Sequence, residues 1–497
     1  MSNAVRLSEP IGGFVSRLAA IRARLEEHAT ADPPPGLTDP DPGATERWEA
    51  GQVWAHLAEF PNYWLGQIAG ILDARANGAP DPIPFGRAKT DPGRVGAIER
   101  DRHQDPAALL RRVTDGIAAA ETTIHAWPPD AWRASGQHPR RGVMTVGEIL
   151  ESFVVGHLEE HADQLDLLRS RSELVSIDRI LAAAARIAGV AVRTPLLAWD
   201  ARTWLKPESL QPVGAFKMRG AYAKLTSLSD AQRAAGVITY SSGNHAQAVA
   251  RAARLLGVKA VIVMPDNAPA VKVAGVRRDG AEIVTCGPAS DERRTIAERL
   301  AAEHGYTMLP PYDDPEVIAG QGTVGLEIVE DLPDVTSVLV PIGGGGLIAG
   351  VAAAVKTLVP KARIIGVEPE DAADARDSLA AGEIVSWPAD RIARTLADGL
   401  RVTAVGRLPF AHMRAFVDEI VTVSDSELRD AMRALATGAR LVVEPSGAAA
   451  MAAHLGGHVP QPDADGARVV ILSGGNVDPD LLAEVLREEP EAAAQPS

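Results

Sequence analysis

The stretch V-L-V-P-I-G-G-G-G-L-I-A-G-V-A-A-A-V, residues 338–355, carries no charge and contains four consecutive glycines, Gly343–Gly346. A membrane-spanning helix needs about 20 apolar residues with few helix breakers, and Pro341 and the glycines interrupt this stretch. We therefore expect a buried strand, a glycine turn and a helix. Such a turn leaves backbone N–H groups free to converge on an anion, and the helix dipole favours a phosphate there. A tight turn without a ligand is the alternative for the loop taken alone.

Short β-branched runs alternate with Ala-rich helical stretches around this segment. The alternation is typical of βαβ units and a mostly parallel sheet, so we expect an α/β domain over residues 177–490. A linker is expected at 169–176 and a disordered tail at 491–497. The expected strands are Gly236–Tyr240, Ala260–Met264, Glu282–Thr285, Ser337–Ile342, Arg363–Val367 and Arg468–Leu472.

Residues 1–168 have a different pattern, in which polar and Pro-rich loops separate helical stretches. Apolar residues from Trp54 to Ile68 recur at spacings of three and four, which indicates one face of an amphipathic helix. Together with three further helical patterns, this predicts an all-α, up-and-down four-helix bundle. The three other helices are expected near Gly12–His28, Pro106–Ala126 and Thr145–Leu168.

Composition excludes several classes of protein. With 497 residues, 46% of them hydrophobic, the chain is expected to fold into about three domains. The net charge of −15 without a basic tract argues against nucleic-acid binding. One cysteine, Cys286, allows no intrachain disulfide and fits a reducing cytoplasm. The N-terminus has no apolar core of signal-peptide length, and we expect no membrane association.

Four motifs in the α/β part carry chemistry. Gly214–Ala221 reads G-A-F-K-M-R-G-A, and Ser241–Gln247 reads S-S-G-N-H-A-Q after an expected strand. Pro341–Leu347 and Leu472–Val477 (L-S-G-G-N-V) also follow expected strands. A partly buried lysine has a lowered pKa that suits reaction with a carbonyl group, although most lysines are solvated. Each motif alone is weak, because a polar or glycine turn is common without a ligand.

In combination these motifs resemble the threonine/serine dehydratase and serine racemase family, over residues 178–488. The resemblance extends to Glu316–Thr323 (E-V-I-A-G-Q-G-T), Thr395–Leu400 (T-L-A-D-G-L) and Val443–Ala448 (V-E-P-S-G-A). It implies a pyridoxal-phosphate enzyme of fold type II, shared with the tryptophan synthase β chain, with two open-sheet subdomains. It also implies a small amino-acid substrate and a homodimer or higher homo-oligomer.

The resemblance implies roles for individual residues. Lys217 is expected to bond the cofactor and to remove the Cα proton, Phe216 to pack on the ring and Asn244 to contact the ring hydroxyl. The phosphate is expected at Gly343, Gly344, Gly345, Gly346 and Leu347, and Ser473 at the pyridine nitrogen. The substrate carboxylate is expected on Ser241, Ser242, Gly243 and His245, with a looser match for Arg294. Ala215 departs from the family, which usually has serine there.

Elimination and racemisation both remain open at this stage. A neutral hydroxyl at the pyridine nitrogen makes the ring a weaker electron sink, which favours β-elimination to a 2-oxo acid and ammonia. Ser242, on the face opposite Lys217, could donate a proton and so permit racemisation. The identity of the hydroxy-amino acid also stays open.

The acidic segment E-P-E-D-A-A-D, residues 368–374, resembles the divalent-cation loop of serine racemases. Glu368 and Asp374 are then expected as carboxylate ligands, with the Ala372 carbonyl between them. Hard oxygen ligands suit Mg²⁺ or Ca²⁺. A solvated acidic loop without a cation is the alternative.

Three histidines stand out in the helical part. His157 and His161 are four residues apart and share one helix face, and His56 lies on another expected helix. Three converging imidazoles could bind a transition metal such as Zn²⁺ or Ni²⁺ with an open coordination position. The pattern resembles the DinB-like four-helix superfamily over residues 8–168, whereas His103, His125 and His138 match nothing and are expected at the surface. Histidines satisfied on helix surfaces are the alternative.

Three functions are compatible with this organisation. In the first, the C-terminal part is a lyase for a hydroxy-amino acid and the bundle is an accessory. In the second, the bundle is a metal- or thiol-dependent transferase coupled to the lyase. In the third, the bundle mediates assembly alone.

Overall fold

The computed structural model divides into two compact units, Met1–Glu173 and Leu174–Ser497. The described residues are 8–30, 32–34, 36–40, 46–172, 174–241, 243–268, 270–287, 290–463 and 466–488. The expected tail at 491–497 lies outside them. Among the described residues, no helix has the length and apolar character needed to cross a membrane.

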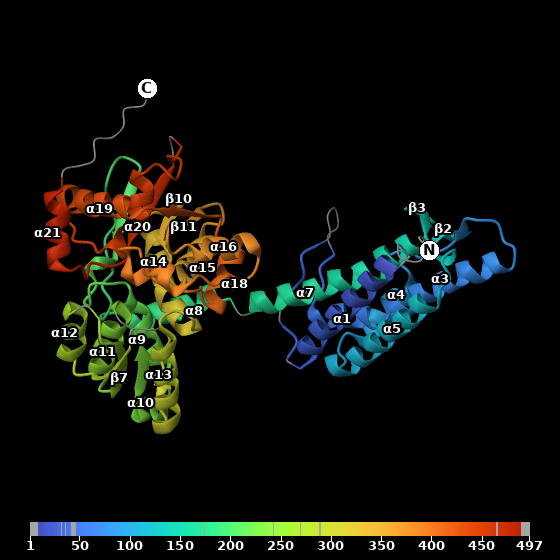
Figure 1. Ribbon diagram of the computed structural model, residues 1–497, viewed down its shortest axis with the longest axis horizontal. Coiled ribbons are helices and arrows are strands. Elements are labelled where there is room, and N and C mark those ends of the chain that lie inside the picture. The colour runs from blue at the N-terminus through green and yellow to red at the C-terminus, as the bar shows by residue number, and fades with distance from the viewer. Residues whose placement is uncertain are drawn as a thin grey trace. The chain divides into compact units, whose positions relative to one another are not determined.

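The N-terminal unit is built from long helices around one apolar core (Figure 1). Helix α1 packs against α5 and α7, and α2 packs against α4, α5 and α7. The helices are α1 (Ser8–Ala29), α2 (Ala50–Leu57), α3 (Phe60–Ala76), α4 (Pro92–Asp101), α5 (Pro106–Ala126), α6 (Val146–Leu150) and α7 (Gly156–Ser172). Because α7 continues to Ser172, it includes the first residues of the expected linker.

The helix expected from Trp54 to Ile68 is two helices, α2 and α3, although its apolar stripe is buried as predicted. Pro61 stands in the first turn of α3 and has no N–H to continue the hydrogen-bond pattern of α2. The expected helical N-terminal domain is confirmed, with additions that the sequence did not indicate. A small sheet of β1 (Ile83–Pro84), β2 (Ser135–His138) and β3 (Gly142–Thr145) accompanies the helices, and α4 is additional.

The helix expected near Thr145–Leu168 is present with an irregularity. Thr145 caps α6 in a capping box with Glu148. A π-helical segment, Glu151–Val155, then joins α6 to α7. Gly156 follows it, and a Cβ there would lie 2.8 Å from the Glu151 carbonyl oxygen. This segment sets the rotation of α7 just before His157.

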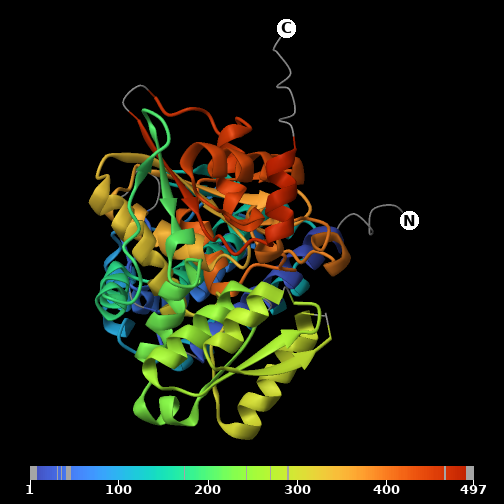
Figure 2. The same ribbon diagram turned by 90° about the vertical axis from the view of Figure 1, so that its left-hand side faces the viewer.

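The C-terminal unit contains two mostly parallel sheets, which confirms the α/β expectation (Figure 2). The larger has the order β12-β11-β10-β13-β5-β4, with β4 antiparallel to β5, and the smaller has the order β8-β7-β6-β9. The larger-sheet strands are β4 (Leu197–Ala198), β5 (Thr203–Pro207), β10 (Val335–Pro341), β11 (Arg363–Pro369), β12 (Glu419–Val423) and β13 (Ala467–Leu472). The smaller-sheet strands are β6 (Val237–Tyr240), β7 (Ala260–Pro265), β8 (Glu282–Cys286) and β9 (Thr307–Met308).

All six expected strands are present within two residues of their predicted ends. Helices lie between the strands and bury their Ala-rich faces, as in α15, where ten consecutive residues from Gly346 to Val355 are buried. The principal helices are α8 (Ile177–Ile187), α9 (Lys217–Ser227), α11 (Asn244–Leu256), α12 (Ala270–Arg278), α13 (Ser290–His304), α14 (Pro315–Asp331), α15 (Gly346–Leu358) and α20 (Pro445–Leu455). Shorter or peripheral helices are α10 (Asp230–Ala235), α16 (Asp374–Ala381), α17 (Ala389–Ile392), α18 (Arg407–Phe416), α19 (Asp425–Ala434) and α21 (Pro479–Arg487).

Candidate functional site

A cavity of about 160 Å³ in the C-terminal unit lies where strands from both sheets end. Ser241 follows β6, Gly343 follows β10 and Ser473 follows β13, and all three line it. Ligands of open α/β sheets bind at the carboxyl ends of the strands. The four motifs quoted from the sequence therefore meet at one place, although about 260 residues separate the first from the last.

Lys217 is the first residue of α9 and stands at the wall of this cavity. Its Nζ donates a hydrogen bond to the Pro311 carbonyl oxygen at 2.6 Å and lies 5.0 Å from the centre of the Phe216 ring. Burial lowers the pKa of Lys217 to about 8. At pH 7 about a tenth of this amine is therefore uncharged and nucleophilic, far more than for a solvated lysine.

The tetraglycine loop connects β10 to α15 along the cavity. At Gly344 a Cβ would lie 2.1 Å from the Tyr312 ring, and at Gly346 it would lie 3.0 Å from Tyr312. Gly345 has a φ of +88°, in the region that favours glycine. The backbone thus lies against Tyr312 on one side and borders the cavity on the other, which requires glycine at these positions.

A polar network that sequence reasoning missed forms the floor of the cavity. Asn244 donates through Nδ2 to Glu444 Oε1, and its Oδ1 accepts a hydrogen bond from Asn476 Nδ2 at 2.9 Å. Lys272 Nζ lies 2.5 Å from Asp398 Oδ2 and 3.5 Å from Glu444 Oε2. Burial raises the pKa of Glu444, although Lys272 opposes the shift. Glu444 and Asn476 fix the orientation of the Asn244 amide.

The sequence contained a signal for this network. Asp398 lies in T-L-A-D-G-L and Glu444 in V-E-P-S-G-A, two stretches that marked the family resemblance without suggesting a role. Lys272 had no such signal, because one lysine on a helix is ordinary. Ser473, also buried, donates to the Ser446 carbonyl oxygen at 3.5 Å, and Ser446 Oγ accepts from the Gly399 amide at 2.8 Å.

The turn expected to hold the substrate carboxylate borders the cavity in part. Ser241, Gly243 and His245 line it, whereas Ser242 lies outside the described residues. The His245 Nε2–H donates to the Leu309 carbonyl oxygen at 3.1 Å, and burial lowers the pKa of His245 to about 3. His245 is therefore a neutral group at this site, and it contributes no positive charge to anion binding.

Arg294 does not line the cavity. Its side chain is more than half exposed and lies 3.9 Å from Glu298 on the same helix, α13. The neighbouring Arg293 lines the cavity instead, and its Nε is buried without a hydrogen-bond partner among the described residues. The rotation of α13, which the sequence does not specify, decides which of the two arginines faces inward.

The expected cation loop places two carboxylates in the interior. Glu368, at the end of β11, accepts hydrogen bonds from the amides of Ala375 at 3.0 Å and Arg376 at 2.8 Å. Neither oxygen of the buried Asp374 has a hydrogen-bond partner of normal geometry among the described residues. Burial raises the pKa of Asp374 to about 7, and burial together with Asp374 raises that of Glu368. Ala372 is buried beside them.

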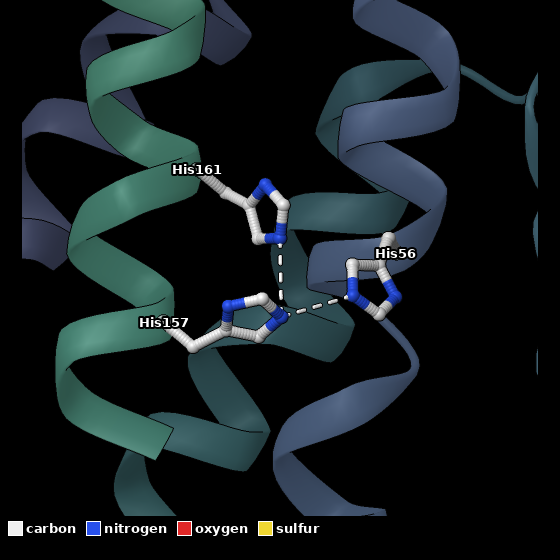
Figure 3. Close-up of side chains that lie close together, drawn as sticks. All are labelled: His56, His157 and His161. Carbon is white, nitrogen blue, oxygen red and sulfur yellow. Dashed lines mark hydrogen bonds between the residues drawn. The ribbon is translucent and has the colours of Figure 1, made fainter. Parts of the chain in front are cut away.

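The three predicted histidines of the N-terminal unit converge (Figure 3). His157 Nε2 lies 3.2 Å from His56 Nε2 and 3.3 Å from His161 Nε2. Within the described residues this is the one cluster of three or more metal-type side chains, with ligand atoms within 4.8 Å of one another. Burial lowers the pKa of His161 to about 3 and that of His56 well below its ordinary value.

The outer nitrogens of the histidine pair are held by other residues. His157 Nδ1 lies 2.9 Å from Glu160 Oε2, and His161 Nδ1 lies 2.8 Å from Gln164 Oε1. A carboxylate only accepts hydrogen bonds, so His157 carries its proton on Nδ1 and presents the Nε2 lone pair to the cluster. Lone pairs this close repel one another unless a proton or a cation lies between them.

The expectation that His138 is a surface residue was wrong. Its side chain is buried at the end of β2, and it lines the same cavity of about 300 Å³ as the three histidines. Its position in sequence, on a short strand away from the helical repeats, gave no signal of this proximity.

Comparisons with known proteins agree with this organisation. The profile of the family described as pyridoxal-phosphate dependent enzyme matches residues 187–475, and that of the DinB superfamily matches residues 17–165. The L-threo-3-hydroxyaspartate ammonia-lyase of Saccharomyces cerevisiae is 44% identical over 307 residues, which are 60% of this chain and 92% of that protein. The catabolic L-threonine dehydratase of Escherichia coli strain K12 is 42% identical over 318 residues, which are 63% of this chain and 96% of that protein. The structure of maize serine racemase matches with a TM-score of 0.59 and 41% identity, covering 62% of this chain and 96% of that one.

Proposed function

Because this chain belongs to the pyridoxal-phosphate dependent enzymes, we propose that it is an ammonia-lyase for L-threonine, L-serine or a related 3-hydroxy amino acid. The products are a 2-oxo acid and ammonia. The observation that carries the proposal is the meeting of Lys217, with its lowered pKa, and the tetraglycine loop in one cavity.

The residues present fit pyridoxal phosphate. A loop in which Cβ atoms would collide with Tyr312, at the start of α15, offers backbone N–H groups to a phosphate. Lys217 would hold the group covalently, Asn244 would contact the ring hydroxyl and Ser473 the pyridine nitrogen. When bound, the cofactor supplies an electron sink that stabilises negative charge at the substrate Cα.

The chain's own groups then perform the proton transfers. Lys217, whose pKa burial lowers to about 8, accepts the Cα proton in its uncharged form. The β-hydroxyl group takes up a proton and leaves as water, and one water returns when the product hydrolyses to 2-oxo acid and ammonia. Backbone N–H groups at the start of α11 and the Arg293 guanidinium bind and orient the substrate carboxylates.

A substrate screen on the full chain tests the proposal. L-threonine, L-serine and L-threo-3-hydroxyaspartate are each incubated with the holoenzyme, and ammonia, 2-oxo acid and D-amino acid are measured. We expect equal amounts of ammonia and 2-oxo acid from at least one substrate. Release of neither product from any of the three would contradict the lyase assignment.

Racemisation is the second candidate, favoured by the likeness to maize serine racemase. It uses the same cavity but needs a proton donor on the face opposite Lys217, the role predicted for Ser242. D-amino acid formed faster than ammonia in the same screen would assign the chain to this alternative.

We further propose that Glu368, Asp374 and the Ala372 carbonyl hold Mg²⁺ or Ca²⁺. Two buried carboxylates with raised pKa values fit a hard cation that would offset their charge, and the Asp374 oxygens have no hydrogen-bond partner of normal geometry among the described residues. The cation would stabilise the loop between β11 and α16.

For the N-terminal unit we propose a transition-metal site at His56, His157 and His161. Imidazoles whose Nδ1 atoms are held by Glu160 and Gln164 fit Zn²⁺, Ni²⁺ or a similar ion. His157→Ala should remove the metal, measured by elemental analysis of untagged full-length protein, and should leave deamination unchanged. His125→Ala, which changes an exposed histidine on α5, is the control. Metal content that is unchanged in His157→Ala would remove His157 from the site. Substoichiometric metal in the wild-type protein after reconstitution with Zn²⁺ and Ni²⁺ would leave the bundle as an assembly module. A homodimer or higher oligomer stays a prediction.

A further inference from the structure

The cavity beside the three histidines extends well beyond them. Its volume is about 300 Å³, and Trp48, Trp64 and Phe153 form an aromatic part of its wall. A three-histidine metal site leaves at least one coordination position open toward such a space. A bare ion needs no cavity of this size, so the remaining volume suits a small organic ligand.

His138 lines this cavity and carries one N–H group that the hydrogen bonds of its turn leave free. Its Nδ1 accepts hydrogen bonds from the backbone amides of Arg140 at 3.2 Å and Arg141 at 3.1 Å, so the proton of the neutral ring is on Nε2. Burial, Arg141 and Arg140 lower the pKa of His138. The ring lies 5.4 Å from Phe85 and 5.3 Å from Phe153, and a Cβ at Gly86 would be 2.6 Å from it. His138 is thus a fixed, neutral hydrogen-bond donor.

Cationic side chains outnumber acidic ones around the cavity. The cations are Arg87, Lys89, Arg94, Arg140 and Arg141, and the acids are Asp39, Glu46 and Glu160. Arg87 is neutralised by Glu59, which accepts two hydrogen bonds from it at 2.6 Å, and Glu160 is bonded to His157. Arg140 and Arg141 belong to the turn that orients His138, and Arg141 lies 4.8 Å from the Phe153 ring. An N–H donor beside two guanidinium groups is suited to a carboxylate.

We propose that this cavity is a second ligand site, which binds a small carboxylate through His138 Nε2–H and Arg141 while the rest of the ligand lies at the open position of the metal. The inference rests on the proposed metal site. A 2-oxo acid, the product class proposed for the C-terminal unit, has this chemistry, because its carboxylate and carbonyl oxygens can both approach a metal ion. The bundle would then bind the product class of the lyase to which it is fused.

The test uses full-length holoenzyme with Co²⁺ as a spectroscopic metal, in excess Mg²⁺ to fill the carboxylate site. Pyruvate is titrated against the Co²⁺ absorption bands, and methyl pyruvate, which lacks the charge, is the ligand control. We expect a saturable change of the Co²⁺ bands with pyruvate. The apparent affinity for the ester should be at least about tenfold weaker, because a hydrogen bond to a charged group changes a binding constant by about tenfold or more.

Matched variants test the residues. His138→Asn keeps an acceptor for the two amides, but its shorter side chain has no N–H at the position of the ring Nε2–H. Arg141→Gln removes the charge from an exposed side chain. Both should weaken pyruvate binding by about tenfold or more at unchanged Co²⁺ content. Arg111→Gln, an exposed arginine of α5 outside the cavity, should leave binding within about twofold.

The outcomes separate the two proposals. A protein that takes up Co²⁺ but does not respond to pyruvate, or responds equally to the ester, would overturn this inference and leave the metal site in place. Unchanged affinity in both variants would overturn the role of His138 and Arg141. A protein that takes up no Co²⁺ would remove the metal site and this inference with it.

Discussion

The two cavities of this chain are assembled in different ways. In the C-terminal unit, Ser241, Gly343 and Ser473 stand on loops after strands that are far apart in sequence, and backbone N–H groups supply much of the polarity. In the N-terminal unit, His157 and His161 stand one turn apart on α7, with His56 opposite on α2, and side chains supply the chemistry.

Burial acts on both sites in the same direction but with different consequences. It lowers the pKa of Lys217 to about 8, which leaves an amine that can both attack and accept a proton. It lowers the pKa of His161 to about 3, which leaves a neutral imidazole at physiological pH. The C-terminal cavity is therefore suited to proton transfer and the N-terminal one to coordination. The two sites should respond independently to substitution.

The largest expected effect is that of Lys217→Ala. Loss of the group that we propose bonds the cofactor and accepts the Cα proton should lower deamination by at least about 10³-fold, measured as ammonia release. Metal content of the N-terminal unit should not change. Lys361→Ala, an exposed lysine of the same unit, is the control. Activity within tenfold of wild type would show that another group is the base, and a parallel loss of metal would show that the units are coupled.

A divalent cation should stabilise the C-terminal unit. At a hundredfold excess over its dissociation constant, Mg²⁺ or Ca²⁺ should add about 2.7 kcal/mol to the free energy of unfolding, because it offsets the charge of Asp374. Melting curves with cation and with EDTA measure this. Asp374→Asn should abolish the difference, whereas Glu370→Gln, an exposed carboxylate nearby, should keep it. A melting temperature indifferent to cation and EDTA would remove the site.

Glu160→Gln should produce a smaller change, confined to the other unit. An amide holds the His157 Nδ1–H less strongly than a carboxylate does, so the affinity for Zn²⁺ should fall about tenfold. Competition with a chromophoric chelator measures it. Asp163→Asn, on the same helix but bonded to Arg24, should have no effect. If Glu160→Gln and Asp163→Asn bind Zn²⁺ with the same affinity, Glu160 does not support the metal site.

The smallest expected effect concerns pH. The lowered pKa of Lys217 implies that the neutral amine fraction rises about fivefold between pH 7 and pH 8 and changes little above pH 9. The rate at which apoprotein reacts with pyridoxal phosphate, followed by absorbance, should show this profile. Nα-acetyl-lysine, run in parallel, should keep rising to about pH 10. Identical profiles would contradict a lowered pKa of Lys217.

Sequence alone indicated much of both sites. The β-branched runs predicted six strands, because buried parallel strands need continuous apolar segments. The tetraglycine loop after one of these runs predicted a place where backbone approaches a ligand, and Gly344 and Gly346 now show why a side chain cannot fit there. His157 and His161 were predicted to share a face because helix geometry sets that relation locally.

Tertiary structure decided what local geometry cannot. The network of Lys272, Asp398 and Glu444 depends on three segments that meet only after the sheets are packed. The choice of Arg293 over Arg294 depends on how α13 is rotated against its sheet, and one residue of rotation turns a side chain by about 100°. His138 reaches the histidine cavity because β2 pairs with β3 and packs beside the helices. Periodicity describes one element at a time, and these contacts arise between elements.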